Sequence, residues 1–185
     1  MVTLRNCESL APSDSGEIPA QLFQTTASKT VDERLWTANK KFRERNPDLS
    51  FFVLDDAEMD AFMQLNWGDY PIFEVYQNAL SGQMKADIFR YCVVFDRGGY
   101  YCDINKSVEV GLRSLHPHES TGLVSFERNE CVVFPGQSAS TQLDHPTKLI
   151  PQWAFGFSPR HPVLARTISN IVEVAKHVGS SPVRS

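Results

Sequence analysis

A helical pattern that stops at two glycines and passes directly into a short apolar strand constrains the fold of this chain more than any other segment. Apolar residues recur at helical spacing through residues 82–97, and Gly98 stands where a helix ends at its C-terminal cap. The strand that follows, Tyr100 to Asn105, ends in side chains that carry oxygen. We therefore expect a helix packed beside a strand whose end delivers polar groups to one place.

Strand-length apolar runs alternate with longer helical patterns along the rest of the chain. We predict strands at 21–24 and 51–54, and helices at 30–45, 57–65 and 72–79. This alternation is typical of an α/β domain with a largely parallel sheet. The 185 residues suit one such domain. We predict that it spans 18–178, between flexible tails at 1–17 and 179–185.

Composition and charge exclude several classes of protein. A net charge of −4 argues against a nucleic-acid binder, because such proteins use a basic surface against the phosphate backbone. No apolar run approaches the roughly 20 residues of a membrane-spanning helix. The four cysteines lack the paired spacing of a zinc or redox motif, so we expect Cys92 and Cys102 to be reduced core residues.

Asp87 and Arg90 are three residues apart, so they share one face of the predicted helix, away from its main apolar stripe. Taken alone, such a pair is most often a surface ion pair that contributes about 0.2–0.5 kcal/mol. Their helix, however, leads within a few residues to the strand that ends in oxygen-bearing side chains. This position favours a functional role.

Asp103 and Asn105 are two residues apart, so on an extended strand both would point to one side while Ile104 points into the core. Hard divalent ions take oxygen ligands, and Mg²⁺ is usually bound by one or two carboxylates together with substrate phosphates. The spacing predicts a metal-diphosphate site. Because such residues also serve turns at strand ends, the tripeptide alone does not identify the site.

These residues belong to a longer series of short motifs. In chain order the motifs are Ile18-Pro19, Gln24-Thr25, Asn46-Pro47-Asp48, Leu54-Asp55-Asp56, Ala86-Asp87-Ile88-Phe89-Arg90-Tyr91, Gly98-Gly99-Tyr100-Tyr101-Cys102-Asp103-Ile104-Asn105 and Gly156-Phe157-Ser158-Pro159-Arg160-His161-Pro162. In these motifs and their order the chain resembles glycosyltransferase family 32, the DxD sugar-binding family that includes fungal α-1,6-mannosyltransferases and bacterial capsular polysaccharide transferases. The resemblance covers roughly residues 18–175.

The resemblance implies a GT-A fold, a Rossmann-like α/β/α sandwich with a mostly parallel sheet. It also implies that a GDP- or UDP-hexose binds with Mn²⁺ or Mg²⁺ at the carboxyl ends of the strands, and that the hexose passes with retention to a glycan or lipid-linked acceptor. Carried over residue by residue, the metal ligands are Asp103 and Asn105, the catalytic residues are Asp103, Asp87 and Arg90, and the donor-binding residues are Asp87, Arg90, Tyr101, Asp103, Gln24 and Thr25.

The chain departs from the family pattern at several positions. Asn105 replaces an aspartate, Thr26 stands where an aromatic residue flanks the nucleotide base, and Trp153 replaces an asparagine. The family continues past the helix that follows His161, so we expect the fold to lack its C-terminal segment. Two interpretations stay open: an active metal-dependent hexosyltransferase, or a catalytically impaired GT-A module that binds donor or a partner without turnover.

Four further expectations follow from the sequence. A nucleotidyltransferase function is less consistent with the sequence, because the chain has no glycine-rich phosphate-binding loop of the kind found in P-loop proteins. Trp67 and Tyr70, in a break between helices, are predicted to contact donor or acceptor. His161, beside a proline, is interpreted as a helix-start residue rather than a catalytic one. The resemblance implies a cytoplasmic location for a bacterial protein and the Golgi lumen for a eukaryotic one.

Overall fold

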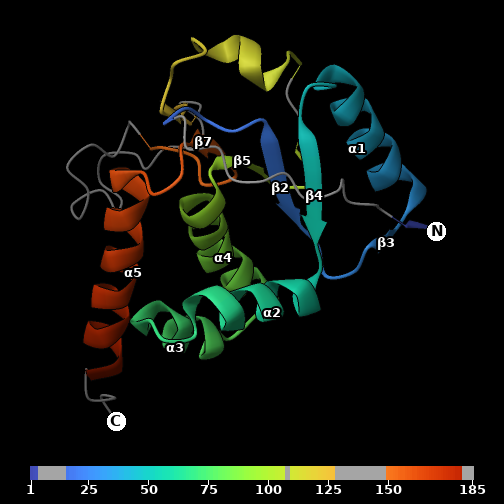
Figure 1. Cartoon of the computed structure of the whole chain (residues 1–185). Helices are drawn as coiled ribbons and strands as arrows, with labels where there is room; N and C mark the ends of the chain where they lie inside the picture. Colours follow the sequence, from blue (N-terminus) through green and yellow to red (C-terminus); the bar gives the residue numbers. More distant parts are fainter. Residues whose placement is uncertain (4–15, 107–108, 128–148, 181–185) are drawn as a thin grey trace, which may run out of the picture.

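The computed structural model describes residues 1–3, 16–106, 109–127 and 149–180. Its centre is a five-stranded sheet in the order β4-β2-β5-β7-β6. Figure 1 labels β4, β2, β5 and β7 of this sheet. The strands are β2 (Gln21–Thr25), β4 (Ser50–Leu54), β5 (Gly99–Cys102), β6 (Gly122–Leu123) and β7 (Ala154–Phe157). Strand β2 runs parallel to β4 and β5, whereas β7 is antiparallel to β5 and β6. Four strands therefore share one direction, and only β7 within this sheet opposes them.

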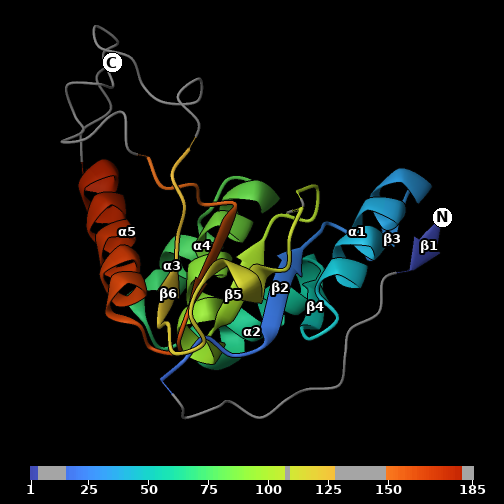
Figure 2. The ribbon, with the colours of Figure 1, turned by 90° about the horizontal axis from the view of Figure 1, so that it is seen from above.

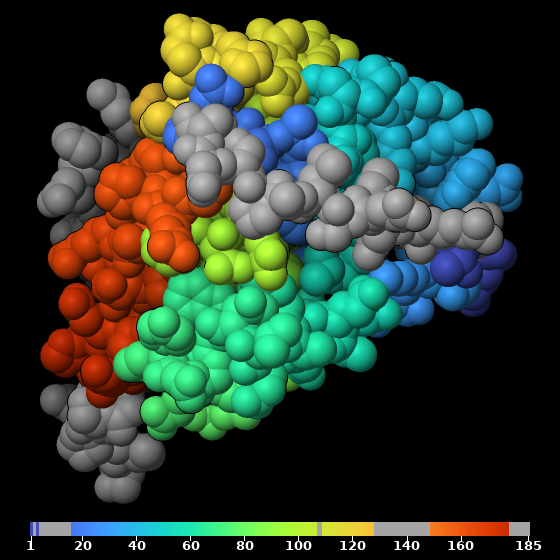
Figure 3. Space-filling model, viewed as in Figure 1, coloured from blue at the N-terminus to red at the C-terminus, as the bar shows by residue number. Residues whose placement is uncertain are grey.

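Helices cover both faces of this sheet. Apolar residues of β2, β5 and β7 on one face pack against four helices: α2 (Asp56–Trp67), α3 (Pro71–Gln77), α4 (Gly82–Arg97) and α5 (Pro162–Ser180). On the other face, Leu22 and Tyr100 pack against α1 (Glu33–Arg45) and the 3-10 helix η1 (Leu112–Leu115). Figure 2 separates α1 at one side of the sheet from α5 at the other. In the space-filling view, α2 and α3 form the lower surface and α5 the left side (Figure 3). The predicted α/β class is confirmed.

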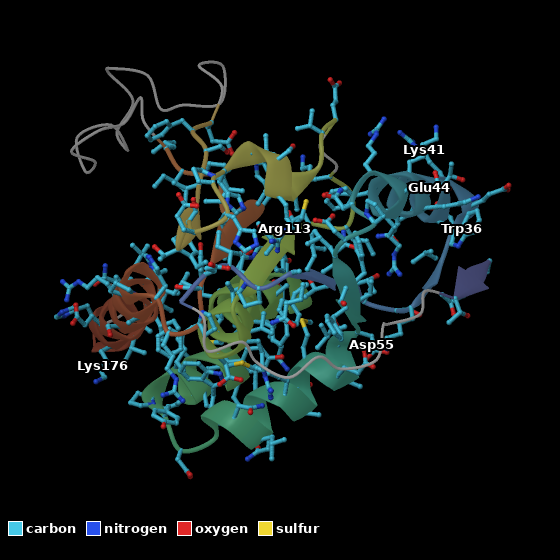
Figure 4. The ribbon with its side chains drawn as sticks, turned by 45° about the horizontal axis from the view of Figure 1, so that its top comes forward. Trp36, Lys41, Glu44, Asp55, Arg113 and Lys176 are labelled. Atoms are coloured by element: carbon cyan, nitrogen blue, oxygen red, sulfur yellow. The ribbon has the colours of Figure 1, made fainter. Side chains whose placement is uncertain are left out.

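The first two long helices begin where side chains cap them. Helix α1 starts at Glu33, three residues later than predicted, because Asp32 accepts a hydrogen bond from the Leu35 amide at 2.7 Å. Residues 30–31 instead form β3 (Thr30–Val31), paired with β1 (Val2–Thr3). Helix α2 starts at Asp56, where Asp55 and Glu58 form a reciprocal capping box. Figure 4 labels Asp55 beside the start of this helix.

Helix α4 has the predicted bounds, and backbone geometry explains its sharp end. The Gly98 amide bonds to the Val94 carbonyl at 2.8 Å, and Gly98 has a φ of +66°. Gly99 follows with a φ of +99°, and a Cβ there would lie 2.5 Å from the carbonyl oxygen of Gln21. Two consecutive positive φ angles and this close approach both require glycine. The chain can therefore leave α4 and enter β5 at once.

The structure describes both predicted ends of the domain, but only a few residues of the two predicted tails. Val2 and Thr3 pair with β3, and α5 continues to Ser180, two residues past the predicted end of the domain. Most of the two predicted tails lies outside the described residues. Among the described helices, none has both the length and the apolar character needed to cross a bilayer.

Candidate functional site

The predicted polar residues gather at the carboxyl edge of the parallel strands. Thr25 ends β2, Tyr101 lies in β5, and Asp103 follows β5 directly. Asp87 and Arg90 reach the same place from the middle of α4. In open α/β sheets, ligands bind in the crevice outside the carboxyl ends of the strands. The strand topology and the polar residues therefore indicate the same location for a site.

Arg90 is the centre of this group. Its side chain is only 5% exposed, and its Nη2 lies 2.6 Å from Asp87 Oδ1 and 3.5 Å from Asp103 Oδ1. Its Nη1 donates to the Gln152 carbonyl at 3.0 Å, and its guanidinium lies 4.8 Å from the centre of the Tyr101 ring. Interpretation of the Asp87–Arg90 pair as a surface ion pair is therefore wrong. The residues before β7 cover a helix face that looked exposed in the sequence.

A chain of hydroxyl groups holds one oxygen of Asp103. The Tyr101 hydroxyl donates to Asp103 Oδ1 at 3.0 Å, so the Thr25 hydroxyl donates in turn to the Tyr101 oxygen, also at 3.0 Å. Burial raises the pKa of the Tyr101 phenol far above its usual value, and the nearby Arg90 only partly offsets this. Tyr101 is therefore a neutral hydrogen-bond donor at any physiological pH.

The side chain of Asp103 is half-buried, and only one of its two carboxylate oxygens is engaged by described residues. Its backbone amide donates to the Trp153 carbonyl at 2.8 Å, which anchors it to the segment before β7. Oδ1 is held by Tyr101 and Arg90, whereas Oδ2 has no hydrogen-bond partner within the described parts of the chain. The carboxylate is thus fixed in direction while one oxygen remains for a ligand.

The prediction that Asp103 and Asn105 project from the same side of a strand is wrong. Strand β5 ends at Cys102, and the Lys106 amide bonds to the Asp103 carbonyl at 2.9 Å, so the segment turns. Asn105 lies in this turn and is exposed. Ile104 does pack inward, against the cluster of Val31 and Val53, as expected. The strand is shorter than predicted because β7 pairs with β5 only as far as the start of the turn.

Gln24 and Thr25 are adjacent in the sequence but serve opposite faces of the sheet, because alternate residues of a strand point to opposite sides. Gln24 is fully buried on the α1 face, where its Oε1 accepts from Asn39 Nδ2 at 2.6 Å. Its Nε2 has no partner among the described residues. Of the two, the structure brings only Thr25 to Tyr101 and Asp103.

Three residues near Asp103 were not predicted as site residues. The Trp153 indole N–H donates to Glu127 Oε1 at 2.9 Å, and Lys106 Nζ lies 5.6 Å from the centre of the Trp153 ring. In the sequence, Trp153 differs from the family pattern, but nothing in its local spacing indicates a place beside Asp103. The pairing of β5 with β7, which joins segments about 50 residues apart, could not be read from local spacing.

Trp67, Tyr70 and His161 lie away from this group. The Trp67 ring packs edge-on against Tyr70 and at a tilt against Phe95, near the C-terminal end of α4 and the amino edge of the parallel strands. His161 precedes α5, and its Nδ1 accepts from the Val163 amide at 3.3 Å. Burial lowers the pKa of His161. The structure agrees with a helix-start role for His161 and does not bring Trp67 or Tyr70 to the site.

The oxygen groups of the site suit a hard divalent ion only together with a ligand. No group of three or more His, Cys, Asp or Glu side chains with metal-binding geometry occurs among the described residues. Asp103 supplies one carboxylate with an open oxygen, and Asn105 supplies an exposed amide oxygen two residues later. Mg²⁺ is commonly held by one or two protein oxygens plus substrate phosphates. The donor set therefore fits such an ion when phosphate oxygens complete it.

Comparison with known proteins gives matches to sugar transferases. The family model "Glycosyltransferase sugar-binding region containing DXD motif" matches residues 32–121. An initiation-specific alpha-1,6-mannosyltransferase of Candida albicans is 25% identical over 87% of this chain and 44% of its own length. The putative glycosyltransferase HOC1 of Saccharomyces cerevisiae is 28% identical over 88% and 41%. Inositol phosphoceramide mannosyltransferase 1 of Schizosaccharomyces pombe is 24% identical over 87% and 45%. The chain spans less than half the length of these relatives.

A solved structure supports the fold. The PaToxG glycosyltransferase superposes with a TM-score of 0.62 at 16% identity, over 90% of this chain and 64% of that one. With the mixed, mostly parallel sheet between helices, this likeness confirms the expected GT-A type of α/β fold.

Proposed function

We propose that this chain, which belongs to the DXD-containing glycosyltransferase family 32, transfers a hexose from a nucleoside-diphosphate sugar to a hydroxyl group of a glycan or lipid-linked acceptor. The observation that carries the proposal is Asp103, oriented by Tyr101 and the buried Arg90 at the carboxyl edge of the parallel strands. The named relatives that transfer mannose favour a mannosyl donor, GDP- or UDP-linked.

Asp87 and Asp103 would bind different parts of the donor. Asp87 has one oxygen on Arg90 and a side chain that is 32% exposed, so it can accept hydrogen bonds from hydroxyl groups of the sugar. Asp103 has its open Oδ2 for the metal-diphosphate end. Arg90 has its donors directed at Asp87, Asp103, Gln152 and its own helix. We therefore assign Arg90 as a positioning residue that fixes both carboxylates, rather than as the cation that receives the diphosphate.

The residues fit a divalent ion, which Asp103 and Asn105 would hold. Such an ion, Mn²⁺ or Mg²⁺, supplies positive charge to a leaving diphosphate. Asn105 contributes oxygen without charge, and its place in an exposed turn leaves Asp103 as the principal ligand. The neutral Tyr101 hydroxyl keeps the other oxygen of Asp103 engaged. This arrangement orients the carboxylate before the ligand arrives.

In the proposed reaction, the protein forms no covalent bond to the sugar. The bond between sugar carbon 1 and the phosphate oxygen breaks, and a bond from the same carbon to the acceptor oxygen forms. We propose that the acceptor attacks from the side of the leaving group, so that the leaving phosphate takes the acceptor proton and configuration is retained. The carbon gains oxocarbenium character, which the nearby carboxylate of Asp87 stabilises.

The second interpretation, a donor-binding module without turnover, is favoured by Asn105. Its amide lacks the second negative charge of the family motif, and it does not share a strand face with Asp103. Binding and turnover must therefore be measured separately.

The test is titration calorimetry with a panel of GDP- and UDP-hexoses, with and without Mn²⁺, combined with assays of donor hydrolysis and transfer. We expect Asp103→Ala to weaken donor binding at least tenfold and to lower kcat/KM by about 10²–10³-fold, the cost of losing one group that stabilises the transition state. Asp103→Asn keeps an acceptor for Tyr101 and checks that the loss is chemical rather than structural.

The matched control is Asp96→Ala. Asp96 is as exposed as Asp103 (32% against 31%) but pairs with Arg97 at the other end of α4, so its loss should leave donor affinity unchanged. Binding that depends on Asp103 without hydrolysis or transfer would identify the module. Absence of any nucleotide-sugar binding that depends on Asp103 would refute the transferase assignment.

A further inference from the structure

We propose that Trp153, with Glu127 and Lys106 beside it, forms a saccharide subsite that holds the pyranose ring of the acceptor next to Asp103. The proposal rests on the function proposed above and names the substrate group that meets the donor. Its ligand class is a neutral hexopyranose at the end of a glycan or glycolipid.

Trp153 is the cross-strand neighbour of Asp103. In the antiparallel β5–β7 pair, Tyr101 lies opposite Phe155 and Cys102 opposite Ala154. The bond from the Asp103 amide to the Trp153 carbonyl continues this register by one pair. Directly opposite residues of an antiparallel pair point to the same face, with Cβ atoms about 4.5–5.5 Å apart. Asp103 and Trp153 lie just outside the paired strands, but their backbone bond holds them side by side, so we infer that the indole lies near the carboxylate that orients the donor.

The indole is held in place yet partly exposed. Its N–H donates to Glu127 Oε1 at 2.9 Å, and the Glu127 amide bonds to the Leu149 carbonyl at 2.8 Å. The side chains of Trp153 and Glu127 are both half-buried. A tryptophan with a fixed edge and an accessible surface is a pre-organised platform, because little rotamer freedom is lost when a ligand settles on it.

The neighbours of the ring match the hydroxyl groups of a sugar. The ring can take the C–H face of a pyranose as apolar contact, whereas the hydroxyl groups at the sugar's edge need hydrogen-bond partners. Glu127 supplies a carboxylate acceptor, and Lys106 supplies three ammonium donors from an exposed side chain. Lys106 now lies over the ring at 5.6 Å, and an exposed cation–π contact of this kind is weak enough for a ligand to displace.

Strand order separates this subsite from the nucleotide. The parallel strands β4, β2 and β5 lie on one side of Asp103, and nucleotides bind over the carboxyl ends of such strands. Trp153 precedes β7, on the other side of Asp103. A sugar on Trp153 would therefore lie on the β7 side of Asp103 and leave the carboxyl ends of β4 and β2 to the nucleotide base.

The experiment follows the indole N–H signals of the full ¹⁵N-labelled chain, which has three tryptophans, with Trp153→Phe to identify the Trp153 signal. The probes are methyl α-mannopyranoside, methyl α-glucopyranoside, methyl β-galactopyranoside and α-linked mannobiose, each added in the presence of GDP or UDP and Mn²⁺. We expect at least one probe to shift the Trp153 signal saturably. Trp153→Ala should weaken the binding of that probe about tenfold or more, as truncating an aromatic anchor does.

Two variants separate a binding role from a structural one. Trp153→Phe keeps a ring and should retain more saccharide affinity than Trp153→Ala. Tyr70→Ala removes an aromatic residue that is 59% exposed at the opposite edge, and it should leave saccharide binding unchanged. Calorimetry with the nucleotide sugars, compared with Asp103→Ala, tests the proposed function independently. The subsite is refuted if no probe moves the Trp153 signal, or if Trp153→Ala weakens donor binding and spares the saccharide.

Discussion

The two edges of the central sheet are built in different ways. The amino edge is closed by backbone: a Cβ on Gly99 would lie 2.5 Å from the Gln21 carbonyl oxygen, and the Arg160 amide donates to the Phe95 carbonyl at 2.6 Å. The carboxyl edge is built from side chains, with Asp87, Arg90 and Asp103 in one polar group. At the amino edge, the close contacts to backbone leave no polar group for a ligand among these described residues. At the carboxyl edge, the side-chain network leaves one oxygen of Asp103 available.

The largest effect on stability is expected at the amino edge, from Gly99→Ala. A residue with a φ of +99° and a Cβ 2.5 Å from a backbone carbonyl must move the strand, so we expect a loss of about 3–5 kcal/mol in the free energy of unfolding. The control is Gly16→Ala, where φ is +70° but nothing lies within 4 Å, with an expected cost of about 1 kcal/mol. Urea denaturation measures both. Equal losses of unfolding free energy for Gly99→Ala and Gly16→Ala would show that the close contact between Gly99 and the Gln21 carbonyl does not constrain the strand.

A smaller loss of stability is expected at the carboxyl edge, from Arg90→Met. The substitution leaves Asp87 and Asp103 facing each other without their cation, but both carboxylates are about one third exposed, so solvent screens part of the cost. We expect about 2–3 kcal/mol in urea denaturation, together with lower donor affinity.

Lys40→Met is the matched control for Arg90→Met. It removes the exposed ion pair with Glu44, which should contribute less than about 1 kcal/mol. If the two substitutions cost the same, Arg90 does not organise this edge, and the contrast with the amino edge would lose its basis.

The smallest effect is a pH dependence at the amino edge. Burial against the Phe157 ring lowers the pKa of His161 in the folded state below its unfolded value near 6.5. Between these two pKa values the unfolded state binds more protons, so His161 should make stability fall as pH decreases below about 6.5. His161→Asn keeps a helix cap and should flatten this part of the curve in thermal unfolding at pH 5 to 7. An unchanged curve would assign the pH dependence to other groups.

The elements that depend on local sequence were predicted well. The end of α4 follows from two glycines, and the alternation of strands and helices follows from apolar periodicity. Helix α2 starts one residue before the predicted start at residue 57, because Asp55 and Glu58 form a capping box that was not predicted. The predictions failed where a distant segment intervened. The predicted strand is longer than β5. Strand β5 ends in a turn that is held to the segment before β7 by the backbone hydrogen bond from Asp103 to Trp153.

By itself, the sequence determined the alternation of helices and parallel strands between residues 21 and 102, the class of the fold and the residue types gathered around Asp103, because spacing and glycine conformation act within a few residues. Only the tertiary structure decided that Arg90 is buried, that Gln24 and Thr25 serve opposite faces, that Asn105 lies in a turn and that Trp153 stands beside Asp103. The physical reason is that burial and register arise from contacts between segments distant in the chain, where hydrogen bonds and packing override local pattern.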